Sequence, residues 1–589
     1  MARDLIELSS IFKEGFPWLL HFTAYWNAKI EQRWLILIGI RHILVIVGLW
    51  ATIVFFAWIL SKYLETVYGD KESKLDRIFI PVENFIYGLI GLDKDKTMKW
   101  KEYFLNVLIF SAFSAVVSFL ILYYQGYLPI NPMHFPDLSW SLALNTAMSI
   151  SSNTNLQHYG GGSSLSYLSQ MVGIQFLQFT SAATGLAVAV AIFRGFAGKK
   201  NQTEGLGNFY VDLVRSLTRV LIPLSFIFAV ILIIIGIPQS LSGYTLVRTL
   251  SGSEQILKIG PVASLVSIMQ LGTNGGGYFG ANSAFPFQNP NPISNYIQMA
   301  LMMIIPTSMP FLFGRMINRM GEGRTILIAS YGLYAIDLII AFIPVTVLGA
   351  GMEAGIGPFS SVFWTVTTTA FTTGSVNASL AAFNPIIIIP AFMGMLIQAT
   401  PGGIGVGAMY MLMYIVITVF IVGLMAGRTP EYLGAKITAG DVKLAVIGFL
   451  SHPIIILIPT VIAYAAGYVH AIGYGTGPTS FTQIFYEFTS AAANNGSDFL
   501  GTTANTVFFN VSTAIVMWAG RFIPIFVMLA IAGRIQERRR SSEISLRTDD
   551  IIFPIVLIVS ILILVILTFF PFLAIGPILM HLEGIKNAL

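Results

Sequence analysis

Four long apolar stretches of the chain contain no Lys or Arg, and a short loop rich in Gly, Asn, Thr and Ser interrupts each of them. In a bilayer, backbone without helical hydrogen bonds is tolerated only where protein buries it or where it lines a water-filled cavity. The fold must therefore shelter four irregular segments at membrane depth. The stretches are 102–193, 259–314, 325–427 and 444–520, and their loops are 152–155, 272–277, 372–375 and 494–497.

The rest of the composition agrees with a membrane protein. The 589 residues are 55% hydrophobic and 10% charged, whereas a soluble domain has about 25% charged residues. Segments of roughly 20 apolar residues are long enough to cross a bilayer. The sequence therefore predicts an all-α polytopic membrane protein with about ten transmembrane helices, at 34–60, 103–124, 165–193, 220–237, 297–314, 326–348, 386–425, 444–464, 507–531 and 551–570.

The basic residues indicate the orientation. Five short clusters, 62–101, 194–219, 315–324, 428–443 and 534–547, hold 24 of the 33 Lys and Arg residues. Short loops rich in Lys and Arg lie on the cytoplasmic side, so the four polar loops are expected on the outer side or dipping in from it. Since the basic residues are spread over separate loops, the pI of about 9.1 reflects topology and gives no indication of nucleic-acid binding.

The segment before the first span, residues 1–33, is mixed in charge, with Trp18, Tyr25 and Trp26 among its interspersed aromatic residues. This pattern predicts an interfacial amphipathic segment and not a cleaved leader. Counting spans back from 62–101 places this tail outside, although it carries four basic residues of its own.

The four stretches share one internal order. A span is followed by a shorter semi-polar segment that predicts a half-helix, then by the polar loop and a second span. The loop centres Thr154, Asn274, Thr373 and Asn495 are separated by 120, 99 and 122 residues, which is typical of repeated units with variable connectors. The half-helices are expected at 139–151, 261–271, 359–371 and 481–493.

This order predicts four pseudo-symmetric membrane–pore–membrane repeats around a central selectivity filter, with one further helix before them and one after. The expected divisions are 1–61 for the tail and first helix, 102–193, 220–314, 325–427 and 444–533 for the repeats, and 551–589 for the last helix.

Residue types in the loops favour cation binding. Gly permits positive φ, so that carbonyl oxygens can turn toward a common axis, and four such loops can replace a cation's hydration shell. A half-helix that ends at the loop points its partially negative end at the ion. Simple extracellular turns are the alternative interpretation.

Two features suggest a barrier below the loops. The segment 386–425 would extend about 60 Å as one helix, against a hydrocarbon core of about 30 Å, and a Gly-rich break at 400–407 divides it. Such a break can gate an ion route, or it can be a plain packing break. Arg521 and Asp337 lie inside predicted spans, where a charge must be paired or face a cavity. The gate and coupling candidates are Gly402, Gly403, Gly405, Gly407 and Arg521.

Several motifs resemble one known family, the potassium-binding subunits of the Kdp-type potassium-transporting ATPases, over about residues 36–577. The matching segments are 152–155 with Gln157, 166–171, 272–279, 281–283, 286–287, 427–434, 494–497 and 520–522. The resemblance implies that this chain selects and conducts K⁺, the bound ion, in the cell membrane of a prokaryote. It also implies that a separate P-type ATPase subunit hydrolyses ATP and that small membrane subunits complete the complex.

The resemblance assigns the K⁺ filter residue by residue. Filter-adjacent positions are Gln157, Gly276, Ser375, Ser497 and Asp498. The filter itself is expected at Asn153, Thr154, Asn155, Thr273, Asn274, Gly275, Thr372, Thr373, Gly374, Asn494, Asn495 and Gly496.

The chain departs from the family pattern at four of these or nearby positions. Thr373 stands where Cys commonly precedes the Gly, Leu156 replaces a usual Trp, and Gln398 replaces a frequent carboxylate. Asp498 adds a carboxylate where a small residue is usual, and it is expected to concentrate cations at the mouth. His158, beside loop one, is expected to be a polar residue of the outer mouth and not a metal ligand.

Two rival readings remain. One is a self-standing potassium channel or symporter of the same superfamily, and the other is an ammonium or Na⁺ pathway. The chain has no phosphate-binding Gly-x-x-x-x-Gly-Lys-Ser/Thr motif and no loop between spans longer than about forty residues. It is therefore not expected to hydrolyse ATP by itself.

Overall fold

The computed structural model describes residues 17–69, 76–198, 205–347, 356–468, 477–538 and 547–588. The chain forms two compact units, Met1–Phe55 and Phe56–Leu589. Helix α2 (Pro17–Tyr68) contains most of the first unit and continues into the second. It includes residues 17–33 of the predicted interfacial segment in the same helix as the first span, and residues 1–16 lie outside the described residues.

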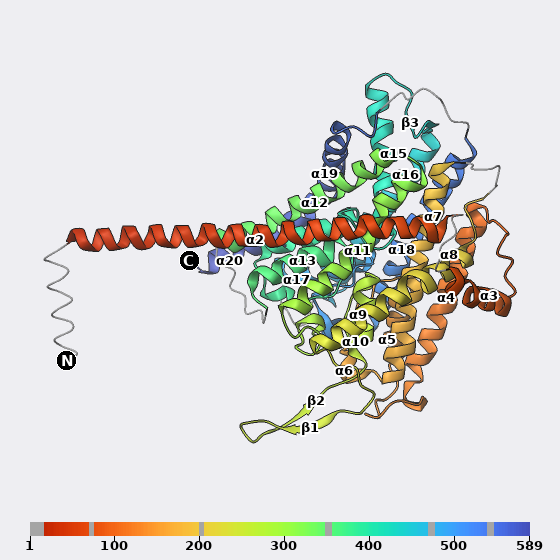
Figure 1. Ribbon diagram of the computed structural model, residues 1–589. Coiled ribbons are helices and arrows are strands. Elements are labelled where there is room, and N and C mark those ends of the chain that lie inside the picture. The colour runs from red at the N-terminus through yellow and green to blue at the C-terminus, as the bar shows by residue number, and fades with distance from the viewer. Residues whose placement is uncertain are drawn as a thin grey trace. The chain divides into compact units, whose positions relative to one another are not determined.

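Helices make up most of the second unit (Figure 1). The remaining α-helices are α3 (Asp76–Ile90), α4 (Trp100–Tyr123), α5 (Trp140–Ser151), α6 (Gly161–Ser164), α7 (Leu177–Ala197), α8 (Phe209–Arg215), α9 (Ile222–Ile235), α10 (Val262–Leu271), α11 (Pro292–Met316), α12 (Met320–Val347), α13 (Pro358–Ala370), α14 (Pro385–Ile397), α15 (Val406–Met425), α16 (Ala439–Ala465), α17 (Pro478–Ala492), α18 (Val507–Glu537), α19 (Ile552–Leu573) and α20 (Leu579–Ala588).

Short 3₁₀ and π segments and two small hairpins complete the fold. One hairpin pairs β1 (Thr245–Arg248) with β2 (Glu254–Leu257), and the other pairs β3 (Glu431–Tyr432) with β4 (Ala435–Lys436). The π segments are η2 (Ser169–Phe176), η3 (Ser216–Leu221) and η8 (Ala574–Ile578), and the 3₁₀ segments are η1 (Gln125–Tyr127), η4 (Asn282–Ala284), η5 (Leu380–Ala382) and η7 (Gly501–Ala504).

The described residues contain ten helices long and apolar enough to cross a membrane, which confirms the predicted all-α polytopic class. The seventh predicted segment is divided as expected, into α14 and α15, and only α15 has the length of a span. The last predicted span is longer than expected, because α19 continues through η8 into α20 across a kink at Gly576.

The spans of the four repeats differ in burial. In α7 with η2, α11, α15 and α18, which follow the polar loops, 89%, 83%, 72% and 72% of the most apolar window is buried. The spans that precede the loops are α4, the continuous segment α8–η3–α9, α12 and α16. Their buried shares are 28%, 33%, 50% and 39%. The second helix of each repeat is therefore an inner helix and the first an outer one.

Each predicted half-helix is present between its outer and inner helix, as α5, α10, α13 and α17. They have 10 to 15 residues, about 15–23 Å at 1.5 Å per residue, which is too short to span. The local sequence explains where two of these half-helices begin. Helices α13 and α17 start with Pro directly after Gly357 and Gly477, which have positive φ. Ser139 caps α5 by accepting a hydrogen bond from the Leu142 N–H.

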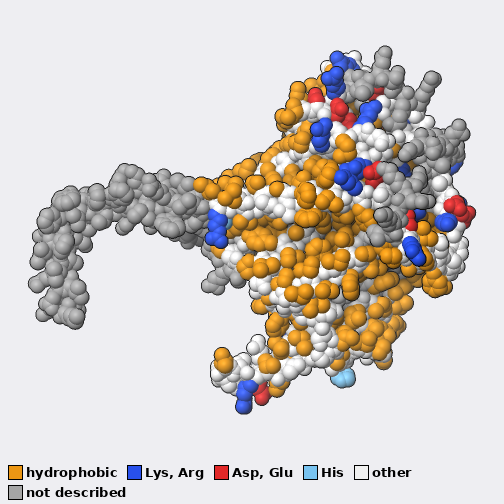
Figure 2. Space-filling view, in the orientation of Figure 1, with side chains coloured by type: hydrophobic (Ala, Val, Ile, Leu, Met, Phe, Trp, Pro, Cys, Tyr) orange, Lys and Arg blue, Asp and Glu red, His pale blue; other side chains and the backbone are white. Residues whose placement is uncertain are grey.

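Contacts bring four of the five basic clusters to one end of the second unit. Leu206 N donates to Met98 O (2.8 Å), and Gln536 Nε2 donates to Gly205 O (2.7 Å). Arg538 Nη1 donates to Lys436 O (2.8 Å). Figure 2 shows hydrophobic side chains over the flank, with most visible Lys and Arg side chains toward the end that carries β3. This separation agrees with the orientation expected from the basic residues.

Candidate functional site

The four polar loops directly follow the C-terminal ends of α5, α10, α13 and α17, and they repeat one backbone pattern. In each loop a residue with positive φ is followed, two positions later, by a second one. Alternating signs of φ allow successive carbonyls to face one side of the chain. The pairs are Asn153 and Asn155, Thr273 and Gly275, Thr372 and Gly374, and Asn494 and Gly496.

The loops meet around Gly275. A methyl group built on Gly275 would lie 2.6 Å from Asn495 O and 2.7 Å from Thr154 O, and it would also touch Thr373 O. In the same way, a methyl group on Gly374 would meet Asn495 O, and one on Gly496 would meet Thr154 O. The central carbonyls of loops one, three and four therefore converge on loop two, and only Gly fits there.

Side chains of loop one fasten it to loop two. Asn153 Nδ2 donates to Thr273 O (3.0 Å), and Asn155 Nδ2 donates to Gly275 O (2.6 Å). Gln157 makes a pair of bonds with the Gly277 backbone, donating to its carbonyl (2.8 Å) and accepting from its N–H (3.0 Å). These amide side chains fix the relative register of the two loops.

Loops three and four are fixed by equivalent contacts. Asn494 Nδ2 donates to Thr154 Oγ1 (3.0 Å), and Asn495 Nδ2 donates to Thr368 O (2.9 Å). Ser375 O accepts from Trp364 Nε1 (2.7 Å). Ser497 Oγ donates to Asn495 Oδ1 (2.5 Å). Two of the filter-adjacent positions, Ser375 and Ser497, therefore help to fix loops three and four.

A hydroxyl four residues before the first positive-φ residue supports three of the loops. Ser149 Oγ accepts from Leu156 N (2.8 Å), Thr368 Oγ1 from Gly374 N (2.8 Å) and Ser490 Oγ from Gly496 N (3.0 Å). Met269 occupies this position before loop two. Sequence reasoning did not single out these residues, although the fourfold spacing of the loops could have shown them.

The expected filter positions therefore lie together, from all four repeats. They present carbonyl and neutral amide and hydroxyl groups, and four half-helices direct their partially negative C-terminal ends at them. Oxygen dipoles without a formal charge suit a monovalent cation that must bind and leave again.

The break in the third repeat lies directly against these loops. Ile404 N donates to Thr273 Oγ1 (3.0 Å), and a methyl group on Gly403 would lie 3.2 Å from the same oxygen. Gly402 and Gly405 have positive φ, and a methyl group on Gly405 would collide with the Gly185 carbonyl of α7. The break therefore fills the space between loop two and an inner helix.

Arg521 of α18 is buried, with 4% exposure. Its Nη2 donates to Ser181 O of α7 at 3.4 Å and lies near Gly185, which contacts Ile404. This hydrogen bond joins the guanidinium to the neighbouring inner helix and not to a carbonyl of the break. Asp337 is also buried, and within the described part of the chain its Oδ2 has no hydrogen-bond partner.

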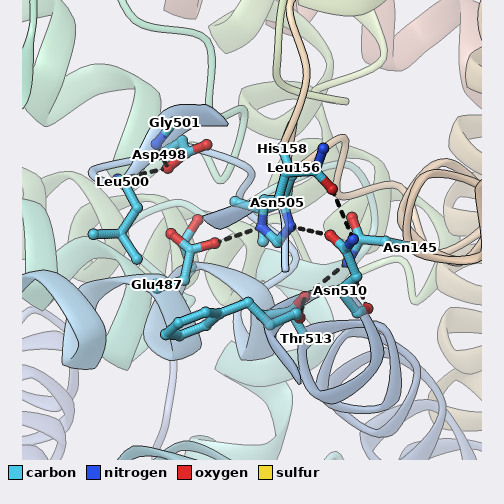
Figure 3. Close-up of polar contacts among 12 residues, drawn as sticks. Asn145, Leu156, His158, Glu487, Asp498, Leu500, Gly501, Asn505, Asn510 and Thr513 are labelled. Carbon is cyan, nitrogen blue, oxygen red and sulfur yellow. Dashed lines mark hydrogen bonds and ion pairs between the residues drawn. The ribbon is translucent and has the colours of Figure 1, made fainter. Parts of the chain in front are cut away.

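A polar cluster behind loops one and four differs from expectation (Figure 3). His158 is fully buried and does not lie open at the outer mouth. Its Nε2 lies 2.8 Å from Glu487 Oε1, and its Nδ1 lies 2.7 Å from Asn510 Oδ1. Asp498 Oδ1 accepts from Leu500 N and Gly501 N. Glu487 was missed by the sequence reasoning.

The chain is similar to a known family along most of its length. Residues 47–582 match the model of the family described as potassium-transporting ATPase A subunit. A potassium-transporting ATPase potassium-binding subunit from Alicyclobacillus acidocaldarius subsp. acidocaldarius is 44% identical over 539 residues, covering 89% of this chain and 95% of that protein. One of the same name from Caldanaerobacter subterraneus subsp. tengcongensis is 40% identical over 551 residues, covering 90% and 97%.

A crystal structure of the potassium transporter TrkH from Vibrio parahaemolyticus aligns with a TM-score of 0.49 at 15% identity, over 83% of this chain and 98% of that one.

Proposed function

The chain belongs to the family of potassium-transporting ATPase A subunits, and from this premise we propose that its four loops form the K⁺ selectivity filter of an ATP-driven uptake complex. K⁺ enters from the outer side, binds among the loops and passes inward below them. The chain selects and conducts the ion, and a partner P-type ATPase subunit hydrolyses ATP.

One observation carries this proposal: the carbonyls of Thr154, Thr373 and Asn495 surround Gly275. Backbone oxygens from three repeats, gathered against the loop of the other repeat, match the type of ligand that replaces the hydration shell of K⁺. Extracellular turns, the alternative reading, have no reason to converge or to be fastened to one another by buried amides.

The remaining parts of the proposal follow the family. Small accessory membrane subunits complete the complex, which resides in the plasma membrane of a prokaryote together with its lipid. The contact between Ile404 and Thr273 supports Gly402, Gly403, Gly405 and Gly407 as a gate directly below the filter. The experiments below distinguish this proposed function from a self-standing channel and from a Na⁺ or ammonium pathway.

Gly275→Asp tests the filter directly, in the purified complex. The side chain would meet three carbonyls, so the K⁺ concentration for half-maximal ATPase activity should rise more than tenfold, or Na⁺ and NH₄⁺ should stimulate in place of K⁺. Gly252→Asp is the matched control, because Gly252 also has positive φ but no atom lies within 4 Å of its Cβ position. An unchanged K⁺ dependence in folded Gly275→Asp would remove loop two from the filter.

A further inference from the structure

The cluster of His158, Glu487 and Asp498 stands outside the filter and has no role in the proposed function. It joins parts distant in sequence: His158 follows loop one, Glu487 lies on α17, and Asp498 follows loop four. The side chains of His158 and Glu487 are fully buried. Figure 3 shows the Glu487 carboxyl next to the imidazole, with Asp498 on its other side.

The hydrogen bonds of Asn510 determine where the first proton of the imidazole lies. Asn510 Nδ2 donates to Asn505 Oδ1 (2.9 Å) and to Ser141 Oγ (3.2 Å). The atom that faces His158 is therefore Asn510 Oδ1, an acceptor, so His158 Nδ1 must carry a hydrogen.

The contact between His158 Nε2 and Glu487 Oε1 then requires one more proton. Either a neutral Glu487 donates to the Nε2 lone pair, or a protonated His158 donates to the carboxylate. Without that proton, a carboxylate oxygen would face a lone pair at 2.8 Å in a buried site. The pair therefore binds one proton in either arrangement.

The cluster offers a proton site and no metal site. Glu487 Oε2 and Asp498 Oδ2 are enclosed and, among the described residues, have no hydrogen-bond donor. Yet no three His or carboxylate side chains in the described ranges are placed to hold a metal ion.

Few other titratable groups face the cluster. The half-helix α5 has none, and α14 and η8, which pack against α17, have none either. Arg521 of α18 is directed at Ser181, eleven positions along from Asn510. The other titratable groups that face the cluster from α17, loop one and α16 each have a hydrogen-bond partner: Tyr486 with Ser497, Tyr159 with Gln157, His452 with Gln398 and Tyr464 with Gly477 O. On α20 the titratable groups are His581, Glu583 and Lys586, and the last two are exposed.

We propose that His158 and Glu487 form a proton-binding site on the outer side, whose occupation is linked to K⁺ binding at the filter. This inference rests on the proposed function of the loops. His158 is the neighbour of Gln157, which fastens loop one to loop two, and Glu487 lies one turn before Ser490, which supports loop four. The site therefore connects two filter loops.

Burial determines the pH range in which the pair holds its proton, and it determines the direction in which pH changes the K⁺ affinity. Loss of solvation raises the pKa of Glu487, on the non-spanning helix α17, to about 8, and it lowers the pKa of His158. Loss of solvation, together with the neighbouring Glu487 carboxylate, also raises the pKa of Asp498 to about 8, so the two carboxyls cannot both ionise easily. The proton accordingly stays on the pair below about pH 8 and leaves above it. Its loss adds one negative charge beside the filter, so K⁺ binds more tightly as external pH rises, and K⁺ binding releases the proton.

The test measures K⁺ dependence of ATPase activity in the intact complex, reconstituted in proteoliposomes, between external pH 6.5 and 9. The K⁺ concentration for half-maximal activity should fall about tenfold with rising pH, the size expected for a unit charge at roughly 10 Å and an effective dielectric constant near 20. Glu487→Gln keeps a donor to His158 Nε2 but cannot titrate, so this dependence should be lost. Glu254→Gln, an exposed carboxyl on the β2 strand, is the matched control and should keep it.

Proton release supplies the second readout. Adding K⁺ to the wild-type complex in weakly buffered medium near pH 8 should release protons, whereas Glu487→Gln and His158→Gln should release none. A wild-type pH dependence that survives in folded Glu487→Gln, or proton release unchanged by both variants, would overturn the inference. If Gly275→Asp shifts K⁺ affinity in the same preparation, the proposed filter stands and only the proton site fails.

Discussion

The backbone N–H of Ile404 donates to the hydroxyl of Thr273 across 3.0 Å, and both residues are buried. This bond joins the broken helix of the third repeat to the second loop of the proposed filter. A movement of Ile404 away from loop two would break this bond, so a direct contact links the proposed filter to the proposed gate.

Thr273→Val should weaken the closed barrier. The substitution removes the acceptor and leaves the buried Ile404 N–H without a partner, which costs about 1–3 kcal/mol. Passive ⁸⁶Rb⁺ flux into proteoliposomes without ATP should therefore rise severalfold above that of the wild type.

Thr273→Ser is the control for this change, since it keeps the hydroxyl at the same position. Equal flux in the Val and Ser variants would mean that the bond to Ile404 does not hold the break closed.

Gln157→Ala should lower K⁺ affinity about tenfold. It removes both bonds to the Gly277 backbone, and loop one then loses part of its register against loop two. Gln239→Ala is the matched control for Gln157→Ala. Gln239 makes the same kind of paired contact, with Ser264 N and Oγ, in an exposed part of the chain. The comparison uses K⁺ titrations of ATPase activity; a similar response in both variants would point to general destabilisation and not to the filter.

The sequence predicts the four half-helices to within three residues, because each lies between a Gly, Pro or Ser start and a polar loop that cannot continue the helix. Glu487 and Asp498 show where such reasoning stops. They are the only carboxylates in 444–520, a stretch without Lys or Arg, and this absence of a local partner was a usable signal. Their partner, His158, is 329 residues away from Glu487, and only the packing of loop one against α17 brings them together.

The predicted break shows a similar limit. Gly and Pro spacing locates it between Ile397 and Val406, but composition does not reveal that Ile404 meets Thr273. The hydrogen bond of Arg521 to Ser181 likewise depends on how two inner helices pack, which no single-chain pattern encodes.

Cross-linking should locate the catalytic partner at the basic end. The described parts of the clusters 194–219, 428–443 and 534–547 meet through bonds such as those of Gln536 and Arg538, on the expected cytoplasmic side. Photo-reactive groups at Glu431 or Arg428 should capture a P-type ATPase subunit, whereas one at Leu250 in the outer hairpin should not. Recovery of this chain alone from every position would favour a self-standing channel.

The last prediction concerns the barrier to passive flow. A cation that enters a four-loop filter runs down its gradient unless something below stops it, and coupling to ATP requires the inward route to be closed. Arg521 places a permanent positive charge in a buried position near Gly185 and Ile404, where it repels K⁺ far more than in water. Arg521→Gln or Arg521→Met should therefore either leak ⁸⁶Rb⁺ without ATP or hydrolyse ATP without transport, while half-saturation by K⁺ stays within about threefold. Arg248→Gln, an exposed arginine on β1 away from the expected partner surface, serves as control. If flux and coupling both stay normal in folded Arg521 variants, the guanidinium only joins α18 to α7, and the break around Gly402–Gly407 must close the route alone.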